Sequence, residues 1–159
     1  MKPHNHNHIL GHSHQAGEKE IKMTIESSME AWKSWSTTSL EYRASIFRKV
    51  ADLISGPYRY KINAAAMLDI GKSIFQAEID ASCELIDFLN FNIEYAHELH
   101  GVFQPFSPPE MDNSLEFRPL EGFVFEIAPF NFFSIGGNLD AASALIGITA
   151  IWKPASSAI

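Results

Sequence analysis

The chain has 159 residues, with 12 lysines and arginines against 19 aspartates and glutamates, so its formal net charge is −7. This acidic balance argues against a nucleic-acid-binding surface, which needs clustered basic residues. Hydrophobic residues make up 46% of the chain, which excludes a largely disordered protein, and no apolar run reaches the ~18–20 residues of a membrane span. With no secretory signal after Met1, we expect a cytoplasmic protein, or a protein of the mitochondrial matrix in a eukaryote.

Residues 1–17 are polar and contain five histidines around an apolar pair. Their alternation predicts a short strand with His4, His6 and His8 on one face. Imidazole groups suit several metals, but this stretch has no cysteine or carboxylate to complete a tetrahedral shell. We therefore predict a polar edge strand or tail over 1–17, with metal capture as an alternative.

Residues 18–101 form a predicted helical part with four helices. The first covers 18–36, and the second follows a capping box made by Thr38 and Glu41. Gly56-Pro57 marks a stop and a restart, so the third helix covers about 58–70 and ends at Gly71. The fourth helix covers about 73–99, and its two apolar faces predict packing on both sides.

Two side chains of the fourth predicted helix could carry chemistry. A catalytic thiolate needs an electropositive setting, whereas the only charged neighbours of Cys83 on its own helix are carboxylates. We therefore predict that Cys83, the only cysteine of the chain, is a small buried hydrophobic residue. Glu84 lies beside an apolar stripe, where a carboxylate requires a partner. A structural hydrogen bond or ion pair and a functional role both stay open for Glu84.

From residue 102 the helical pattern gives way to loops and strands. Alternating residues predict a strand over 114–120, within a linker or oligomerisation segment that covers 102–122. A strand over 123–128, a helix over about 134–146 and a strand over 147–153 follow within 123–159. This order predicts an α/β fold with a βαβ unit and parallel strands. Ligands of such sheets bind at the carboxyl ends of the strands, which are here Ala128 to Asn131 and Lys153 to Ser156.

Several motifs narrow the assignment further. No glycine-rich phosphate-binding motif follows the first strand, and Gly136 and Gly137 fall inside the predicted helix, where glycine favours close packing. The informative segments are instead Pro129-Phe130-Asn131-Phe132, Ile135-Gly136-Gly137-Asn138-Leu139 and Trp152-Lys153-Pro154, supported by 74–81, 84–89 and 118–124. Together they resemble the aldehyde dehydrogenase superfamily, and within it the pyrroline-5-carboxylate dehydrogenases, also called L-glutamate γ-semialdehyde dehydrogenases. The resemblance covers nearly the whole chain.

The resemblance implies a fold and a reaction. The fold is the N-terminal part of an aldehyde dehydrogenase, with helices followed by the first βαβ unit of a parallel Rossmann-like sheet. The reaction is the NAD-dependent oxidation of L-glutamate γ-semialdehyde, the open form of pyrroline-5-carboxylate, to glutamate in proline breakdown. In that family a cysteine thiolate attacks the aldehyde, hydride passes to NAD, and a glutamate activates the water that hydrolyses the thioester. Both residues lie beyond position 159 in the family, so we expect an inactive isolated chain and a homo-oligomeric full-length protein.

The resemblance also implies roles for single residues. Asn131 matches the amide that stabilises the oxyanion of the adduct, which suits a fixed N–H donor at a strand end. Lys153 matches the lysine that holds the adenosine ribose of NAD. Glu84 and Phe132 match the semialdehyde pocket. Further positions match the surroundings of the cofactor, namely Ala128, Pro129, Phe130 and Ser156, although Ala128 stands where relatives often carry serine. No metal site is implied.

Two alternatives remain beside this interpretation. The chain could be a non-catalytic binding or oligomerisation fragment, because a single βαβ unit exposes apolar surface that other elements normally cover. It could also come from an aldehyde dehydrogenase of other substrate specificity. The main interpretation requires the Asn131 amide and the Lys153 ammonium to project from adjacent parallel strands toward one shared crevice.

Overall fold

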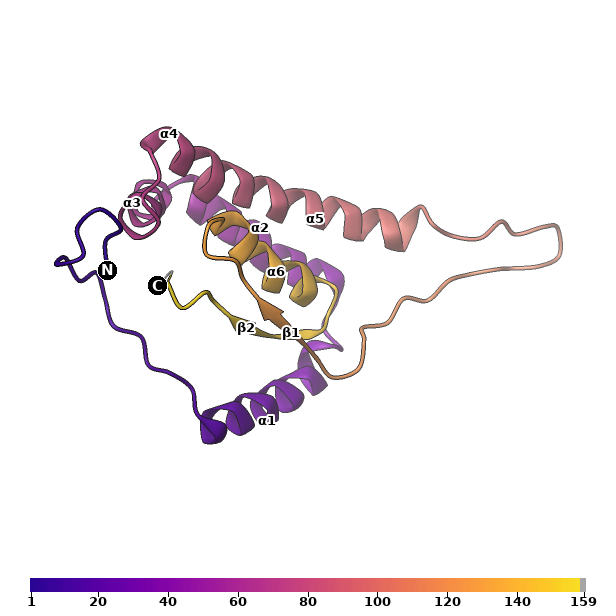
Figure 1. Ribbon diagram of the computed structural model, residues 1–159. Coiled ribbons are helices and arrows are strands. Elements are labelled where there is room, and N and C mark those ends of the chain that lie inside the picture. Colours follow the sequence, from indigo (N-terminus) through magenta and orange to yellow (C-terminus); the bar gives the residue numbers. More distant parts are fainter. Residues whose placement is uncertain (158–159) are drawn as a thin grey trace.

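The structure is a computed structural model that describes residues 1–157. Helices lie on both faces of a two-stranded parallel sheet in this part of the chain, with α1 against one face and α6 against the other (Figure 1). Helices α2 and α5 cover the outer side of α6. The elements are, in chain order, α1 (Glu18–Trp35), α2 (Leu40–Ser55), α3 (Arg59–Asp69), α4 (Ile74–Ala77), the π-helical η1 (Glu78–Cys83), α5 (Glu84–Gly101), β1 (Phe123–Ile127), α6 (Phe133–Leu145) and β2 (Thr149–Lys153).

The predicted βαβ unit is present. Strands β1 and β2 are parallel, with Phe123 opposite Thr149 and Ile127 opposite Lys153, and α6 connects them. The chain turns from α6 into β2 at Gly147, which has a φ of +93°. A Cβ atom at Gly147 would lie 2.6 Å from Cγ of Pro119, so this turn requires glycine on two grounds. The fold class expected from the sequence is therefore confirmed.

The core lies between α6 and the two helices that cover it. Apolar residues of α2 are buried there, together with residues of α5 and α6: Leu40, Ala44, Ile93, Ala96 and Leu145 in one cluster, and Ala51, Ile54, Leu85, Leu89 and Ala141 in the next. Gly137 allows α6 to approach α5 closely, because a Cβ atom at this position would lie 3.1 Å from Cδ1 of Leu85. The packing role predicted for this glycine is confirmed.

The predicted fourth helix is continuous but irregular, because η1 joins α4 to α5 within it. Most of its buried apolar residues recur every four positions, at Ala77, Ala81, Leu85, Leu89 and Ile93. In a regular α-helix a spacing of four overshoots one turn by about 40°, so such a stripe would drift around the axis. The wider turns of the π-helix compensate for this drift. Phe75 and Ile79 of the second predicted face are 73% and 42% exposed, so the described residues leave this end of the second face uncovered.

The two strands predicted outside the βαβ unit are absent from the described residues. Residues 2–7 form turns with an isolated bridge between Lys2 and Asn5, and residues 8–17 have no regular secondary structure, so no strand aligns His4, His6 and His8. Residues 114–120 lie in one limb of a long projecting segment, 102–122 (Figure 1). There the Gln104 side chain exchanges two hydrogen bonds with the Leu115 backbone.

The N-terminus of α2 is capped one residue later than predicted. The Ser39 hydroxyl accepts the Tyr42 N–H at 3.2 Å, while the Thr38 hydroxyl donates to the Trp35 carbonyl at 2.7 Å. Either hydroxyl could cap a helix, but the Thr38 hydroxyl is already hydrogen-bonded to the turn that precedes α2. The predicted capping box of Thr38 and Glu41 was therefore wrong by one position.

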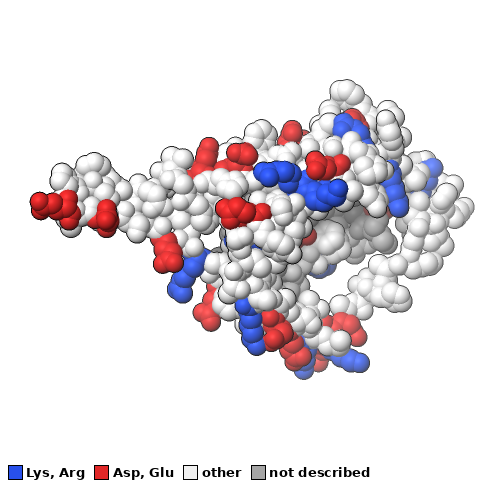
Figure 2. Space-filling model, turned by 180° about the vertical axis from the view of Figure 1, so that it is seen from behind, with Lys and Arg blue, Asp and Glu red and all other residues white. Residues whose placement is uncertain are grey.

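Charge is unevenly distributed over the surface. Figure 2 shows acidic side chains at the far end of the projecting segment, which contains Glu110 and Asp112, while basic residues are scattered over the helices. No helix within residues 1–157 is long and apolar enough to cross a membrane.

Candidate functional site

The carboxyl ends of β1 and β2 meet at one edge of the sheet. Ile127 pairs with Lys153, and the Ala128 N–H donates to the Lys153 carbonyl at 3.1 Å. The segments 128–131 and 153–156 therefore begin side by side, as the sequence predicted. Asn131 and Lys153 are both exposed at this edge.

The Lys153 side chain is available for a ligand. No hydrogen bond or ion pair engages its ammonium within the part of the chain that the structure describes. An ammonium has three donors and can bind two hydroxyls of a sugar at once. A lysine in this state at a strand end fits the ribose of a dinucleotide.

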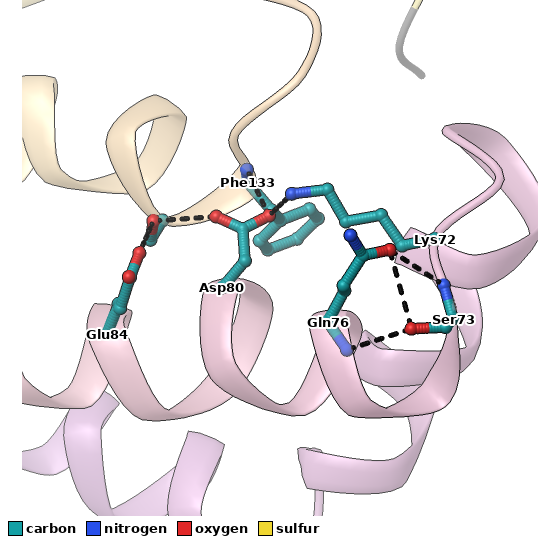
Figure 3. Close-up of polar contacts among 7 residues, drawn as sticks. Lys72, Ser73, Gln76, Asp80, Glu84 and Phe133 are labelled. Carbon is teal, nitrogen blue, oxygen red and sulfur yellow. Dashed lines mark hydrogen bonds and ion pairs between the residues drawn. The ribbon is translucent and has the colours of Figure 1, made fainter.

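The corner that follows Asn131 has an unusual cap. Phe132 is the N-cap of α6, and its phenyl side chain offers no acceptor for the free N–H groups of the first turn. The Asp80 carboxylate, from η1, accepts the Phe133 N–H at 3.2 Å instead (Figure 3). A negative charge at this position also interacts favourably with the helix dipole.

Asp80 is the centre of a polar cluster. Its carboxylate is 4% exposed, forms an ion pair with Lys72 and lies 2.9 Å from the Ser134 hydroxyl (Figure 3). The same Lys72 ammonium lies 4.7 Å from the centroid of the Phe132 ring, which is a cation–π contact. The ion pair therefore contacts both Phe132 and Phe133, the two residues that follow Asn131.

Glu84 belongs to the same cluster. The Ser134 hydroxyl lies 2.9 Å from Oε2 of Glu84 as well as 2.9 Å from Oδ1 of Asp80. A hydroxyl has one hydrogen, so Ser134 donates to one of these carboxylates at a time. The partner that the sequence required for Glu84 is thus a serine of α6.

A comparison with known proteins decides the family. The aldehyde dehydrogenase family model matches residues 1–159. The chain belongs to the aldehyde dehydrogenase family. It is 46% identical over 159 residues to the human mitochondrial delta-1-pyrroline-5-carboxylate dehydrogenase, covering all of this chain and 28% of that protein. It is also 46% identical over 154 residues to the mitochondrial enzyme of that name from Dictyostelium discoideum, covering 97% of this chain and 28% of that one.

Solved structures agree with this aldehyde dehydrogenase assignment. A crystal structure of the delta-pyrroline-5-carboxylate dehydrogenase from Mycobacterium tuberculosis matches with a TM-score of 0.96 and 46% identity, covering 98% of this chain and 29% of that one. The same enzyme bound with NAD matches with a TM-score of 0.95 and 46% identity, with the same coverage. The chain thus spans under a third of the length of these relatives. The resemblance inferred from the Phe-Asn-Phe and Trp-Lys-Pro motifs is confirmed.

The surroundings of Cys83 in this aldehyde dehydrogenase chain differ from those expected. Arg59 of α3 lies 3.4 Å from the half-buried Cys83 thiol, beside Glu78, so the neighbours are not carboxylates alone. Hydrogen bonds from Arg59, and then from Asn63, lower the pKa of Glu78. Cys83 belongs to this α3–η1 cluster and forms no contact with the strand ends within residues 1–157.

The sequence did not predict a second carboxylate pair, which the structure shows. Glu126 of β1 is 8% exposed and accepts a hydrogen bond from the Ser143 hydroxyl, and Asp140 lies on the same helix as Ser143. Oε2 of Glu126 and Oδ1 of Asp140 are buried and have no partner among the described residues. Burial raises the pKa of Asp140, and the nearby Glu126 carboxylate adds to this effect. The sequence feature that could have indicated this pair is Glu126, a single carboxylate inside the apolar run of β1.

The histidine-rich tail provides no comparable site. No group of three or more histidine, cysteine, aspartate or glutamate side chains is arranged to hold a metal ion within residues 1–157. The metal alternative therefore has no geometric support from the described part of the chain.

Proposed function

We propose that this chain is the N-terminal part of an NAD-dependent dehydrogenase that oxidises L-glutamate γ-semialdehyde, the open form of pyrroline-5-carboxylate, to glutamate. The observation that carries this proposal is the register of β1 and β2, which sets Lys153 beside Ala128 and the loop that contains Asn131. The nucleophilic cysteine and the general-base glutamate of the reaction come from residues outside this chain. The isolated chain is therefore inactive.

Asn131 supplies the oxyanion contact in this proposal. When a thiolate adds to the aldehyde carbon, the carbonyl oxygen gains negative charge, and the side-chain N–H of Asn131 donates to it. Asn131 is exposed at the strand edge, immediately before the rigid corner of α6. A single preorganised donor of this kind lowers the barrier by about 3–4 kcal/mol.

The exposed strand edge fits the adenosine half of NAD. Lys153 donates to the ribose hydroxyls, while Pro129, Phe130 and Ser156 lie on the two segments that flank it, and Ala128 offers only backbone atoms for a contact. The NAD nicotinamide supplies the hydride acceptor when the cofactor is bound. The N-terminus of α6 already holds the Asp80 carboxylate, which would repel a phosphate, so the pyrophosphate lies elsewhere.

Glu84 and Phe132 provide the substrate side of the site. The semialdehyde is an amino acid with an ammonium group, and a half-buried carboxylate such as that of Glu84 is a suitable partner for it. The Phe132 ring is partly exposed and is held from one side by Lys72, so it presents a fixed apolar wall. Glu84 would thus bind the ammonium group of the semialdehyde, and the Phe132 ring would contact its apolar part.

A chimera tests the proposed function. The 159-residue chain replaces the matching N-terminal segment of the Mycobacterium tuberculosis enzyme, and NADH production is followed with pyrroline-5-carboxylate. We expect turnover in the chimera, a loss of about 10²–10³-fold in kcat for Asn131→Ala, and a higher KM for NAD with Lys153→Ala. Unchanged kcat in Asn131→Ala would contradict the proposal. The isolated chain is the negative control.

The projecting segment 102–122 suits an oligomer contact. Its large apolar side chains are exposed, including Phe103, Phe106, Met111, Leu115 and Phe117. We propose that a second copy covers them in the full-length protein, because patches of this kind mark association surfaces. Sedimentation of the chimera should show a smaller assembly for Phe106→Ser, and an unchanged assembly would refute this contact. Given the mitochondrial names of the eukaryotic relatives, we also propose the mitochondrial matrix for a eukaryotic source and the cytoplasm for a bacterial one.

A further inference from the structure

The backbone that follows Asn131 is not held in place by its own side chains. Phe132 has extended dihedral angles, φ −128° and ψ 110°, and makes no side-chain cap. The Gly136 N–H reaches the Phe132 carbonyl at 3.2 Å, as the first helical bond of α6. The Phe133 N–H lies before that bond and needs an acceptor from elsewhere.

Asp80 supplies this acceptor from a distant part of the chain. It lies 53 residues before Phe133, in the π-helical η1, and its carboxylate is almost completely buried. Lys72 and the Ser134 hydroxyl hold its two oxygens from other directions. The carboxylate therefore has one position, and the Phe133 N–H is fixed with it.

The ion pair also fixes the residue on the other side of the corner. Lys72 forms the ion pair with Asp80 and lies over the Phe132 ring. Asn131 is exposed, and no hydrogen bond engages its side-chain amide within residues 1–157. The two residues that follow Asn131 are held by Asp80, through the Phe133 N–H, and by Lys72, through the Phe132 ring.

We infer that Asp80 is a positioning residue for the oxyanion amide of Asn131, acting through the cap on Phe133 and through Lys72 on Phe132. This inference rests on the proposed function, in which Asn131 contacts the reacting oxygen. Because Asp80 is buried, we assign it no direct contact with substrate or cofactor. A displacement of about 1 Å at a catalytic group costs about 10²-fold in rate, so the cap has a kinetic consequence.

A double-mutant cycle in the chimera tests the inference. Asp80→Ala should lower kcat by about 10- to 100-fold in the chimera and leave the KM for NAD unchanged. In the Asn131→Ala background, the same change should lower kcat by less than about 2-fold, because the amide that Asp80 positions is already gone. Asp80→Asn keeps an acceptor for the Phe133 N–H but loses the charge that faces Lys72. Its kcat should therefore lie between that of the unchanged chimera and that of Asp80→Ala. Asp87→Ala, an exposed carboxylate on α5, is the matched control and should keep the kcat of the chimera.

The outcomes separate the two proposals. If Asn131→Ala keeps full kcat, the proposed function fails. If Asn131→Ala loses activity but Asp80→Ala lowers kcat equally in both backgrounds, Asp80 is only structural and the inference is overturned. If Asp80→Ala does not fold, the cycle with Asp80→Asn gives the same decision, since an equal loss in both backgrounds again overturns the inference. Hydrogen exchange in the isolated chain gives a readout besides activity, and unchanged protection of the Phe133 amide in Asp80→Ala would also overturn the inference.

Discussion

Two carboxylate pairs lie at helix α6, and they differ in the number of hydrogen-bond and ion-pair partners that the chain provides. At the N-terminus of α6, Asp80 and Glu84 receive three partners: the Lys72 ammonium, the Phe133 N–H and the Ser134 hydroxyl. Farther along, the Ser143 hydroxyl donates to Glu126, and Glu126 and Asp140 each keep a buried oxygen without a partner among the described residues.

This difference shows which of the two carboxylate pairs holds its side chains in one fixed position. A buried carboxylate is tolerated when a cation and several donors neutralise it, and it then has a single position. At the N-terminus of α6, Asp80 meets this condition next to Asn131 and Phe132, a proposed catalytic and a proposed substrate residue. The second pair does not meet it, so it lowers the stability of the folded chain without fixing a site.

The largest effect is expected from removing the cation of the first pair. Lys72→Met leaves the Asp80 carboxylate buried without its ion-pair partner, because the two side chains are 16% and 6% exposed. We expect a loss of about 3 kcal/mol in the free energy of unfolding. Urea unfolding of the 159-residue chain measures it. Lys61→Met, at an exposed position of α3, is the control, and equal losses in the two variants would contradict the contrast between the pairs.

A smaller loss is expected at the second pair. Ser143→Ala removes the hydroxyl that Glu126 accepts from, and leaves this buried carboxylate without a side-chain donor. The expected cost is about 2 kcal/mol, the typical desolvation penalty of an unsatisfied buried group. Ser45→Ala on α2 is a matched change, because its hydroxyl is exposed and bonds only to the Tyr42 carbonyl. If both variants unfold at the same urea concentration, Ser143 does not support Glu126.

The smallest expected change is a gain in stability, and it concerns Asp140. Burial and Glu126 raise the pKa of Asp140, so the folded state binds a proton more tightly there than the unfolded state does. Stability from this group is present below the unfolded pKa, near 3.9, and is lost as the pH rises through the raised folded value. Asp140→Asn should therefore stabilise the chain by about 1 kcal/mol at neutral pH. Thermal unfolding of both chains between pH 4 and pH 8 measures it, and a gain that does not grow with pH would contradict the assignment.

The sequence predicted the βαβ unit well because its evidence is local. Apolar runs over β1 and β2 flank a helix of small residues, the Pro129 motif follows β1, and the Trp152 motif includes the last residues of β2. The alternation at 114–120 was equally local but misleading, since a strand also needs a neighbour to pair with, and the projecting segment offers only the Gln104 side chain.

The features that the sequence did not predict depend on distant pairs. Asp80 and Phe133 are 53 residues apart, and no local pattern connects them. A weaker signal was present, because a helix that starts at Phe132-Phe133 has no residue of its own to cap it. The π-helical turns likewise depend on packing against α6, although the run of four-residue spacings indicated an irregular helix.

The π-helical segment also limits which insertions and deletions this part of the chain can accept. Each residue of an α-helix adds about 100° of rotation. Deleting one residue between Asp80 and Glu84 would leave a helix that could close into regular turns, with little loss of backbone hydrogen bonding. The two carboxylates would then lie three residues apart, about 60° around the axis, and their positions relative to the Ser134 hydroxyl would change. We therefore expect chain-length changes here to be tolerated by folding far better than by turnover.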